Sequence, residues 1–163
     1  MSDFVTGVDL STGAWTRQRF EEELGRAVSA AHRHHGPLSL LYVDVDELQE
    51  HNDLHGTDRG DEVISRVAEL ISREADGRGP IGRVDGGAFG LLLHPMAERE
   101  AVQLAERIRR NISARLATPS SRVTVSVGVA QLKPCEPWGN LLDAAQQACT
   151  WAKQSGRNAV ASR

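Results

Sequence analysis

The stretch Leu38-Ser39-Leu40-Leu41-Tyr42-Val43-Asp44-Val45-Asp46 decides the fold of this 163-residue chain. It is a mostly apolar run of strand length that ends in two carboxylates, which is typical of a buried central strand. Because side chains two residues apart share a face of a strand, Asp44 and Asp46 are expected to point the same way. Such a pair suits one or two Mg²⁺ ions that hold a triphosphate. The alternative is a pair of ordinary acids that face solvent.

Helical and strand patterns lie on both sides of this run. Apolar residues at helical spacing predict helices over 16–35, 57–75, 98–116 and 140–154, the last capped by Asn140 and followed by Gly156. Strands are predicted over 81–84 and 88–93, as a hairpin, and over 122–129 and 158–161. The order predicts an α+β fold, an α/β sandwich in which helices surround a central mixed sheet that contains an antiparallel hairpin.

Composition narrows the class of protein. We expect one domain over residues 1–163, with residues 1–8 as a lead-in, although an excised domain of a larger protein would look the same. The chain has 19 Lys+Arg against 22 Asp+Glu and only 4% aromatic residues, which argues against nucleic acid or an anionic membrane as a partner. No apolar stretch approaches the roughly 20 residues of a membrane helix, and no signal peptide is visible. A cytoplasmic location is therefore expected.

Two further groups of residues carry candidate chemistry. Asn52 and Asp61 can read guanine, because a carboxylate accepts hydrogen bonds from N1–H and the 2-amino group; the alternative is a turn followed by a helix cap. Lys153 and Arg157 flank the end of the last helix and can neutralise phosphates, or they can simply complement the helix dipole. The pair His51 and His55 has helical i, i+4 spacing but falls in a predicted turn.

Together these segments resemble the GGDEF family, the diguanylate cyclases that join two GTP molecules into cyclic di-GMP. The resemblance covers about residues 9–160 and implies a fold like the palm of nucleotidyl cyclases. The similar segments are 9–20 (family D-x-L-T-G-L-x-N-R…F), 44–53 (D-I-D-x-F-K-x-x-N-D), 56–61 (G-H-x-x-G-D), 125–130 (T-x-S-x-G-V-A) and 152–158 (A-K-x-x-G-R-N).

The chain departs from the family at the signature itself. The family has R-[YLV]-G-G-[DE]-E-F, where this chain has Arg83-Val84-Asp85-Gly86-Gly87-Ala88-Phe89. The register without a gap places Gly87 on the acidic metal ligand and Ala88 on the glutamate. Alignment on the glycine pair deletes the metal ligand instead. Both acids of the turn are lost in either register.

The resemblance implies what this loss costs. In the family a metal is held by the first aspartate, the next backbone carbonyl and the third residue of the signature, so only Asp44 and the Val45 carbonyl remain here. The family lysine after F is replaced by Gln49, and the inhibitory R-x-x-D motif for cyclic di-GMP is absent from residues 76–79, which read Asp-Gly-Arg-Gly. Because charge stabilisation dominates such reactions, no useful cyclase activity is expected.

The sequence therefore predicts a catalytically inactive, degenerate GGDEF domain of bacterial cyclic di-GMP signalling that acts through a signalling protein partner, GTP or both. No catalytic residues are expected in the turn of Asp85, Gly86, Gly87, Ala88 and Phe89. No cofactor is required, with Mg²⁺ only as a companion of GTP, and nucleotide contacts fall to Asn52, Asp61, Lys153 and Arg157. One alternative is an active cyclase with an atypical metal site completed by Asp85. Another is an interaction scaffold without a ligand.

Overall fold

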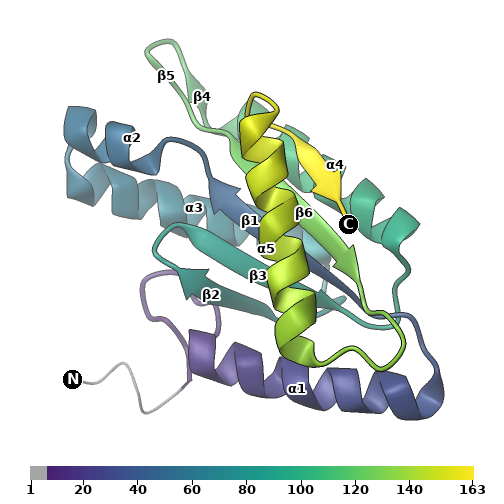
Figure 1. The fold of residues 1–163 in the computed structure, drawn as a ribbon. Helices are drawn as coiled ribbons and strands as arrows, with labels where there is room; N and C mark the ends of the chain where they lie inside the picture. The colour runs from purple at the N-terminus through teal and green to yellow at the C-terminus, as the bar shows by residue number, and fades with distance from the viewer. Residues whose placement is uncertain (1–6) are drawn as a thin grey trace.

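The computed structural model describes residues 7–163, so residues 1–6 of the expected lead-in lie outside it. Figure 1 shows its helices and strands. Within the described residues no helix is long and apolar enough to span a membrane. The helices are α1 (Arg17–His34), α2 (Leu48–His55), α3 (Thr57–Ala75), α4 (Glu98–Arg115) and α5 (Trp138–Gln154). The strands are β1 (Ser39–Val45), β2 (Ile81–Asp85), β3 (Ala88–Leu93), β4 (Ala117–Thr118), β5 (Ser121–Arg122), β6 (Val125–Gln131) and β7 (Val160–Ser162).

A five-stranded mixed sheet forms the centre of the fold, as predicted. Its strand order is β2-β3-β1-β6-β7, with β1 antiparallel to both β3 and β6, and β7 parallel to β6. Residues of α3 and α4 pack on one face, and residues of α1 and α5 on the other. The deciding strand β1 is therefore the middle strand of a three-layer α+β sandwich.

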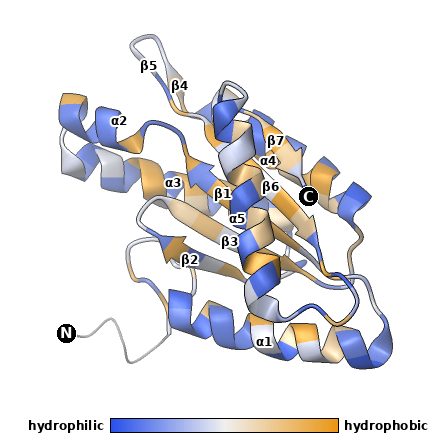
Figure 2. Ribbon diagram, viewed as in Figure 1, coloured by the Kyte–Doolittle hydropathy of each residue, from blue (hydrophilic) through white to orange (hydrophobic). Residues whose placement is uncertain are grey.

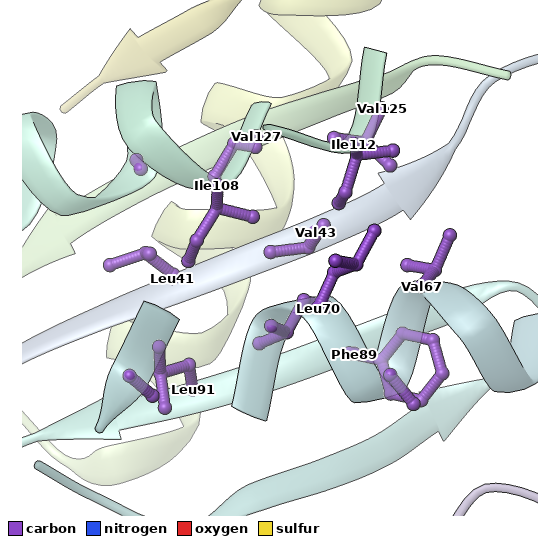
Figure 3. Packing of buried hydrophobic residues seen from close by; sticks show 14 of the residues in the cluster. Leu41, Val43, Val67, Leu70, Phe89, Leu91, Ile108, Ile112, Val125 and Val127 are labelled. Atoms are coloured by element: carbon purple, nitrogen blue, oxygen red, sulfur yellow. The ribbon is translucent and has the colours of Figure 1, made fainter. Parts of the chain in front are cut away.

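Burial of both sheet faces explains the apolar run of β1. Leu41, Val43 and Val45 belong to the core cluster under α3 and α4, whereas Leu40 and Tyr42 belong to the cluster under α1 and α5. Figure 3 shows the first cluster, and Figure 2 shows the apolar residues gathered on the strands and the inner helix faces. Since neither face meets water, both side-chain sets of the strand must be apolar.

Two sequence interpretations of local structure were wrong. Residues 48–55, read as a turn, form helix α2, and Gly56 with φ of 90° separates it from α3, so neither Thr57 nor Asp58 caps α3 by its side chain. Helix α5 begins at Trp138 after Pro137, so Asn140 lies inside its first turn and does not cap it. The expected Gly156 does follow the C-cap, with φ of 115°. The short hairpin β4–β5 was not predicted, and β6 begins only at Val125.

One glycine of the sheet is fixed by close contact with a helix. A Cβ atom placed on Gly128 of β6 would lie 1.9 Å from the Ala145 carbonyl oxygen and 2.3 Å from the Cys149 nitrogen. Both atoms belong to the backbone of α5, which cannot rotate away as a side chain can. The bare Cα of Gly128 therefore sets the distance between β6 and α5.

We predict that Gly128→Ala lowers the free energy of unfolding by at least about 2 kcal/mol, because α5 must move off the sheet. Gly139→Ala is the matched control, since a Cβ there meets nothing within 4 Å. That variant should be neutral or more stable by up to about 1 kcal/mol, because alanine favours the helix over glycine. Guanidinium denaturation measures both, and equal effects of the two substitutions would contradict the assigned contact.

Candidate functional site

The candidate site lies at the carboxyl end of β1, beside the β2–β3 turn and the end of α5. Asp44 pairs with Ala88 of β3 on one side and with Ser126 of β6 on the other. The Val45 N–H donates to the Gly87 carbonyl at 3.0 Å, which holds the turn against the end of β1. The turn at residues 85–88 and Asp44 are thus next to each other in space.

The second aspartate of the strand end is a structural anchor. The Asp46 side chain is only 3% exposed. It accepts hydrogen bonds from the hydroxyls of Thr124 and Ser126, both at 2.7 Å, and from the Asn158 N–H at 3.0 Å. Lys153 Nζ makes a fourth contact at 3.3 Å. A carboxylate offers about four acceptor positions, so Asp46 has none left for a metal ion.

The Lys153 ammonium occupies the space between the two aspartates. Its Nζ is 3.4 Å from Asp44 Oδ2 and 3.3 Å from Asp46 Oδ1, which confirms that both carboxylates point the same way. Burial raises the pKa of Asp44; Lys153 opposes this rise, and the charges of Asp46 and Asp85 add to it. One ammonium is therefore shared among neighbouring carboxylates and is already neutralised by them.

Gly87 stands where a second carboxylate could join Asp44 in a cation site. A Cβ atom placed on it would lie 3.9 Å from Asp44 Oδ1, so a carboxylate at this position would have Asp44 within reach. The nearest obstacle is Leu48 Cδ2 at 2.7 Å, the end of a flexible side chain. This direction agrees with the register of the signature without a gap.

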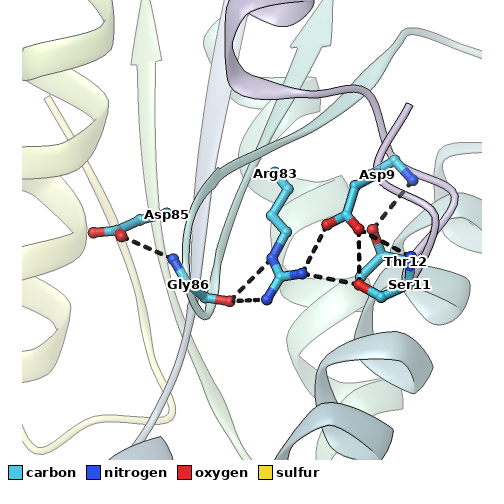
Figure 4. Close-up of polar contacts among 7 residues, drawn as sticks. Asp9, Ser11, Thr12, Arg83, Asp85 and Gly86 are labelled. Atoms are coloured by element: carbon cyan, nitrogen blue, oxygen red, sulfur yellow. Dashed lines mark hydrogen bonds and ion pairs between the residues drawn. The ribbon is translucent and has the colours of Figure 1, made fainter. Parts of the chain in front are cut away.

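Asp85 does not take the place of this missing acid in the structure. Its Oδ1 accepts a hydrogen bond from the Gly86 N–H at 2.8 Å, and the side chain is exposed. In Figure 4 it lies on the other side of the turn from Arg83. The Asp85 carboxylate is close enough to raise the pKa of Asp44 by its charge, but it caps its own turn.

The donor set does not fit a metal ion of the kind the family resemblance implies. Mg²⁺ demands near-octahedral oxygen ligands and is held through carboxylates together with substrate phosphates. Asp44 and the Val45 carbonyl are the remaining protein donors, because Asp46 is saturated and position 87 has no side chain. Within residues 7–163, no three His, Cys, Asp or Glu side chains converge as ligands.

Asn52 and Asp61, the residues predicted to read guanine, lie near the junction of α2 and α3. The Asn52 Oδ1 atom is buried and is without a hydrogen-bond partner among residues 7–163. It lies against Gly60, where a Cβ would come within 1.6 Å of that oxygen, so only glycine fits there. Asp61, the next residue, is exposed beside it. A buried acceptor left unpaired costs about 1–3 kcal/mol, which a donor on a ligand would recover.

Of the two predicted phosphate contacts, Lys153 lies in the last turn of α5 and Arg157 in the loop that follows it. Arg157 and Asn158 have positive φ angles of 63° and 45°, and the Asn158 N–H bond to Asp46 fixes this bend. Arg157 is exposed, with Nε 4.0 Å from Glu47 Oε1. Gln49, which replaces the family lysine, donates to Asp53 at 2.9 Å instead of facing the site.

The β2–β3 turn is held by hydrogen bonds from Arg83, which were not predicted from the sequence. Arg83 donates to Asp9 Oδ2 at 2.7 Å and to the Ser11 hydroxyl at 3.0 Å, and it also donates to the Gly86 carbonyl at 2.8 Å (Figure 4). Burial alone would raise the pKa of Asp9, but hydrogen bonds from Arg83 and Ser11 outweigh it and hold the pKa below 3.8. Asp9 lies in the 9–20 segment and Arg83 in the 83–89 segment, so both residues belong to motifs that the sequence had already indicated.

Comparisons with known proteins show the family to which the chain belongs. The family described as "Diguanylate cyclase, GGDEF domain" matches residues 6–159. Diguanylate cyclase DosC of Shigella sonnei is 29% identical over 98% of this chain and 36% of its own length. The probable diguanylate cyclase DgcT of Escherichia coli is 32% identical over 95% of this chain and 35% of its own length. The chain thus spans little more than a third of these relatives.

Solved structures share the fold closely. The GGDEF domain of DgcB from Caulobacter crescentus, in complex with c-di-GMP, has a TM-score of 0.92 at 30% identity and covers 96% of this chain and 95% of its own. Diguanylate cyclase SiaD from Pseudomonas aeruginosa, in complex with its activator SiaC, has a TM-score of 0.91 at 28% identity and covers 97% of this chain and 62% of its own.

We predict that Gly87→Asp creates a divalent-cation site, because the new carboxylate faces Asp44 across the turn. Mn²⁺ binding, followed by electron paramagnetic resonance, should strengthen by at least about tenfold, since a second carboxylate replaces a neutral position. Gly86→Asp is the control, as a Cβ at Gly86 meets nothing within 4 Å and adds the same charge toward solvent. Equal Mn²⁺ affinity of the unaltered chain and Gly87→Asp would contradict the incomplete donor set.

Proposed function

The chain belongs to the GGDEF domain family of cyclic di-GMP signalling, and from this premise we propose that it is a catalytically silent member that binds GTP and acts as a regulatory module toward a protein partner. The single observation that carries the proposal is that the cation site beside Asp44 is incomplete. Gly87 faces Asp44 without a side chain, and the Lys153 ammonium lies between Asp44 and Asp46.

The chemistry explains why this arrangement is silent. In cyclic di-GMP synthesis the 3′-hydroxyl of one GTP attacks the α-phosphate of another, and pyrophosphate leaves. The negative charge of the phosphoryl oxygens must be stabilised, and this is the main catalytic term. Lys153 is 3.3–3.4 Å from two carboxylates, so the three groups together carry −1 and offer the phosphates little attraction.

Binding of GTP without turnover is supported by the other end of the site. Asn52 Oδ1 is a buried acceptor without a partner among the described residues, and Asp61 lies exposed beside it. A guanine presents N1–H and a 2-amino group, which are the donors that these two acceptors need. Exposed Arg157 is the cation left for the phosphates. No metal ion is required for these contacts.

A domain that does not make product can still act in signalling by binding another protein. SiaD, a structural neighbour of the same family, is described in complex with its activator SiaC, which is a precedent for protein contacts by this fold. The segment Asp-Gly-Arg-Gly at residues 76–79 lacks the inhibitory R-x-x-D motif, so we do not expect cyclic di-GMP to bind there in the manner of the family.

We predict no formation of cyclic di-GMP when the chain is incubated with GTP and Mg²⁺ or Mn²⁺ and the products are separated by chromatography. The physical reason is the unmet charge at the α-phosphate. An active diguanylate cyclase of the family, assayed in parallel, is the control. Robust product that disappears in Asp44→Ala would establish the alternative, an active cyclase in which Asp85 swings toward Asp44.

We also predict that GTP binds more tightly than ATP in calorimetry and that Asp61→Ala weakens GTP by at least about tenfold, the cost of one charged hydrogen-bond acceptor. Asp58→Ala is the matched control, an exposed aspartate in the first turn of the same helix. Affinity should be similar with Mg²⁺ and with EDTA. Absence of GTP binding would leave only the protein-contact part of the proposal, a scaffold without a ligand.

A further inference from the structure

A second cavity lies on a different face of α2 from Asn52 and is lined by basic side chains. Its volume is about 350 Å³, within the range of small-molecule sites. It is bounded by α2, α3, the end of α4 and the β4–β5 hairpin, and we call it the basic pocket. Its lining residues are His51, His55, Arg59, Glu62, Val63, Arg66, Arg115, Leu116, Thr118, Ser120, Ser121 and Val123.

Positive charge is concentrated in the basic pocket although the chain as a whole carries −3. Three guanidinium groups line it against a single carboxylate, Glu62, and that carboxylate already pairs with Arg59 at 3.3 Å. Within the described part of the chain, no carboxylate lies within 4 Å of the side-chain nitrogens of Arg66 or Arg115. Two exposed cations thus flank one cavity without a carboxylate partner and would attract an anion there.

The remaining lining suits a phosphate ester. The His51 and His55 rings lie against each other, with centroids 4.7 Å apart and planes tilted by 49°, and the hydroxyls of Ser120 and Ser121 add neutral donors. Burial lowers the pKa of His51, and the neighbouring His55 lowers it further, so the His51 ring offers an N–H donor without a fixed charge. Arginine forks and hydroxyl donors together are the groups that proteins use to hold phosphates.

An apolar floor makes room for the body of the ligand. Val63, Leu116 and Val123 line the same cavity beneath the basic and hydroxyl groups. A smaller neighbouring cavity of about 160 Å³ extends to Asp46 and Thr124. The residues that it shares with the basic pocket are His51, His55, Val63, Ser120, Ser121 and Val123. The basic pocket therefore connects to the end of β1 along the underside of α2.

We propose that the basic pocket binds a small phosphorylated ligand, held through Arg66 and Arg115 with the hydroxyls of the β4–β5 hairpin. This inference goes beyond the proposed function, because it uses none of the residues assigned to GTP. Its position beside α2 places the ligand next to the helix that carries Asn52.

The experiment is a calorimetric titration of the chain with pyrophosphate and, separately, with orthophosphate. Saturable binding is expected for pyrophosphate, and Arg66→Gln combined with Arg115→Gln should weaken it by at least about tenfold. Arg73→Gln, an exposed arginine of α3 paired with Glu69 outside the pocket, is the matched control and should leave affinity within about twofold. Circular dichroism checks that each variant is folded.

Two results would overturn the proposal. One is the absence of saturable binding by both probes. The other is pyrophosphate binding that survives the double arginine variant and is lost in Arg157→Gln, because Arg157 is the cation assigned to the phosphates of GTP and the probe would then bind at the GTP site. That second result would overturn the basic pocket but leave the proposed function intact. Conversely, a failure of GTP to bind would overturn GTP binding but would not affect the pyrophosphate titration of the basic pocket. Perturbation of the His51 and His55 ring signals in nuclear magnetic resonance spectra by pyrophosphate is the supporting local readout.

Discussion

The Asp46 carboxylate is the contact on which the candidate site depends. It joins three segments that are far apart in sequence: the end of β1, the beginning of β6 through Thr124 and Ser126, and the loop after α5 through Asn158. A buried charge is tolerated only when its acceptor positions are filled, so the buried Asp46 carboxylate requires these donors. Their arrangement fixes where Lys153 and Arg157 stand relative to Asp44.

The same arrangement determines what the strand end can do. Of the two carboxylates at the strand end, Asp46 is buried and all of its acceptor positions are used by the fold, so it is not available for chemistry. Asp44 is left with one shared ammonium and a glycine opposite it. The turn itself is well supported, since Arg83 ties the Gly86 carbonyl to Asp9. The missing acids are therefore a change of side chains on an intact scaffold and not a collapse of the loop.

Much of this fold follows from the sequence because its strongest patterns are long and amphipathic. The helix over 57–75 and the strand before Asp44 have many apolar positions whose spacing leaves little choice. Helix α2 was missed because it is short and has no buried residue, so it carries no apolar stripe to recognise. The β4–β5 hairpin has only two residues in each strand, too few for an alternation to show.

The features of the site that could not be predicted from the sequence depend on contacts between distant residues. Proximity of Asp44 and Asp46 follows from the period of a strand, but the saturation of Asp46 arises from donors about 80 and 110 residues away. No local pattern encodes such contacts. The Asp9–Arg83 pair and the basic pocket are likewise products of the tertiary arrangement, since their members come from separate elements.

Helix α2 contributes residues to both the proposed GTP contacts and the basic pocket. It begins at Glu47 in a left-handed conformation without a side-chain cap, ends at Gly56 with φ of 90°, and buries no residue fully. A short helix with so little anchoring gains much of its order from what binds to it. One of its faces carries Asn52, and another carries His51 and His55. The proposed GTP contacts and the basic pocket therefore use different faces of the same weakly anchored helix.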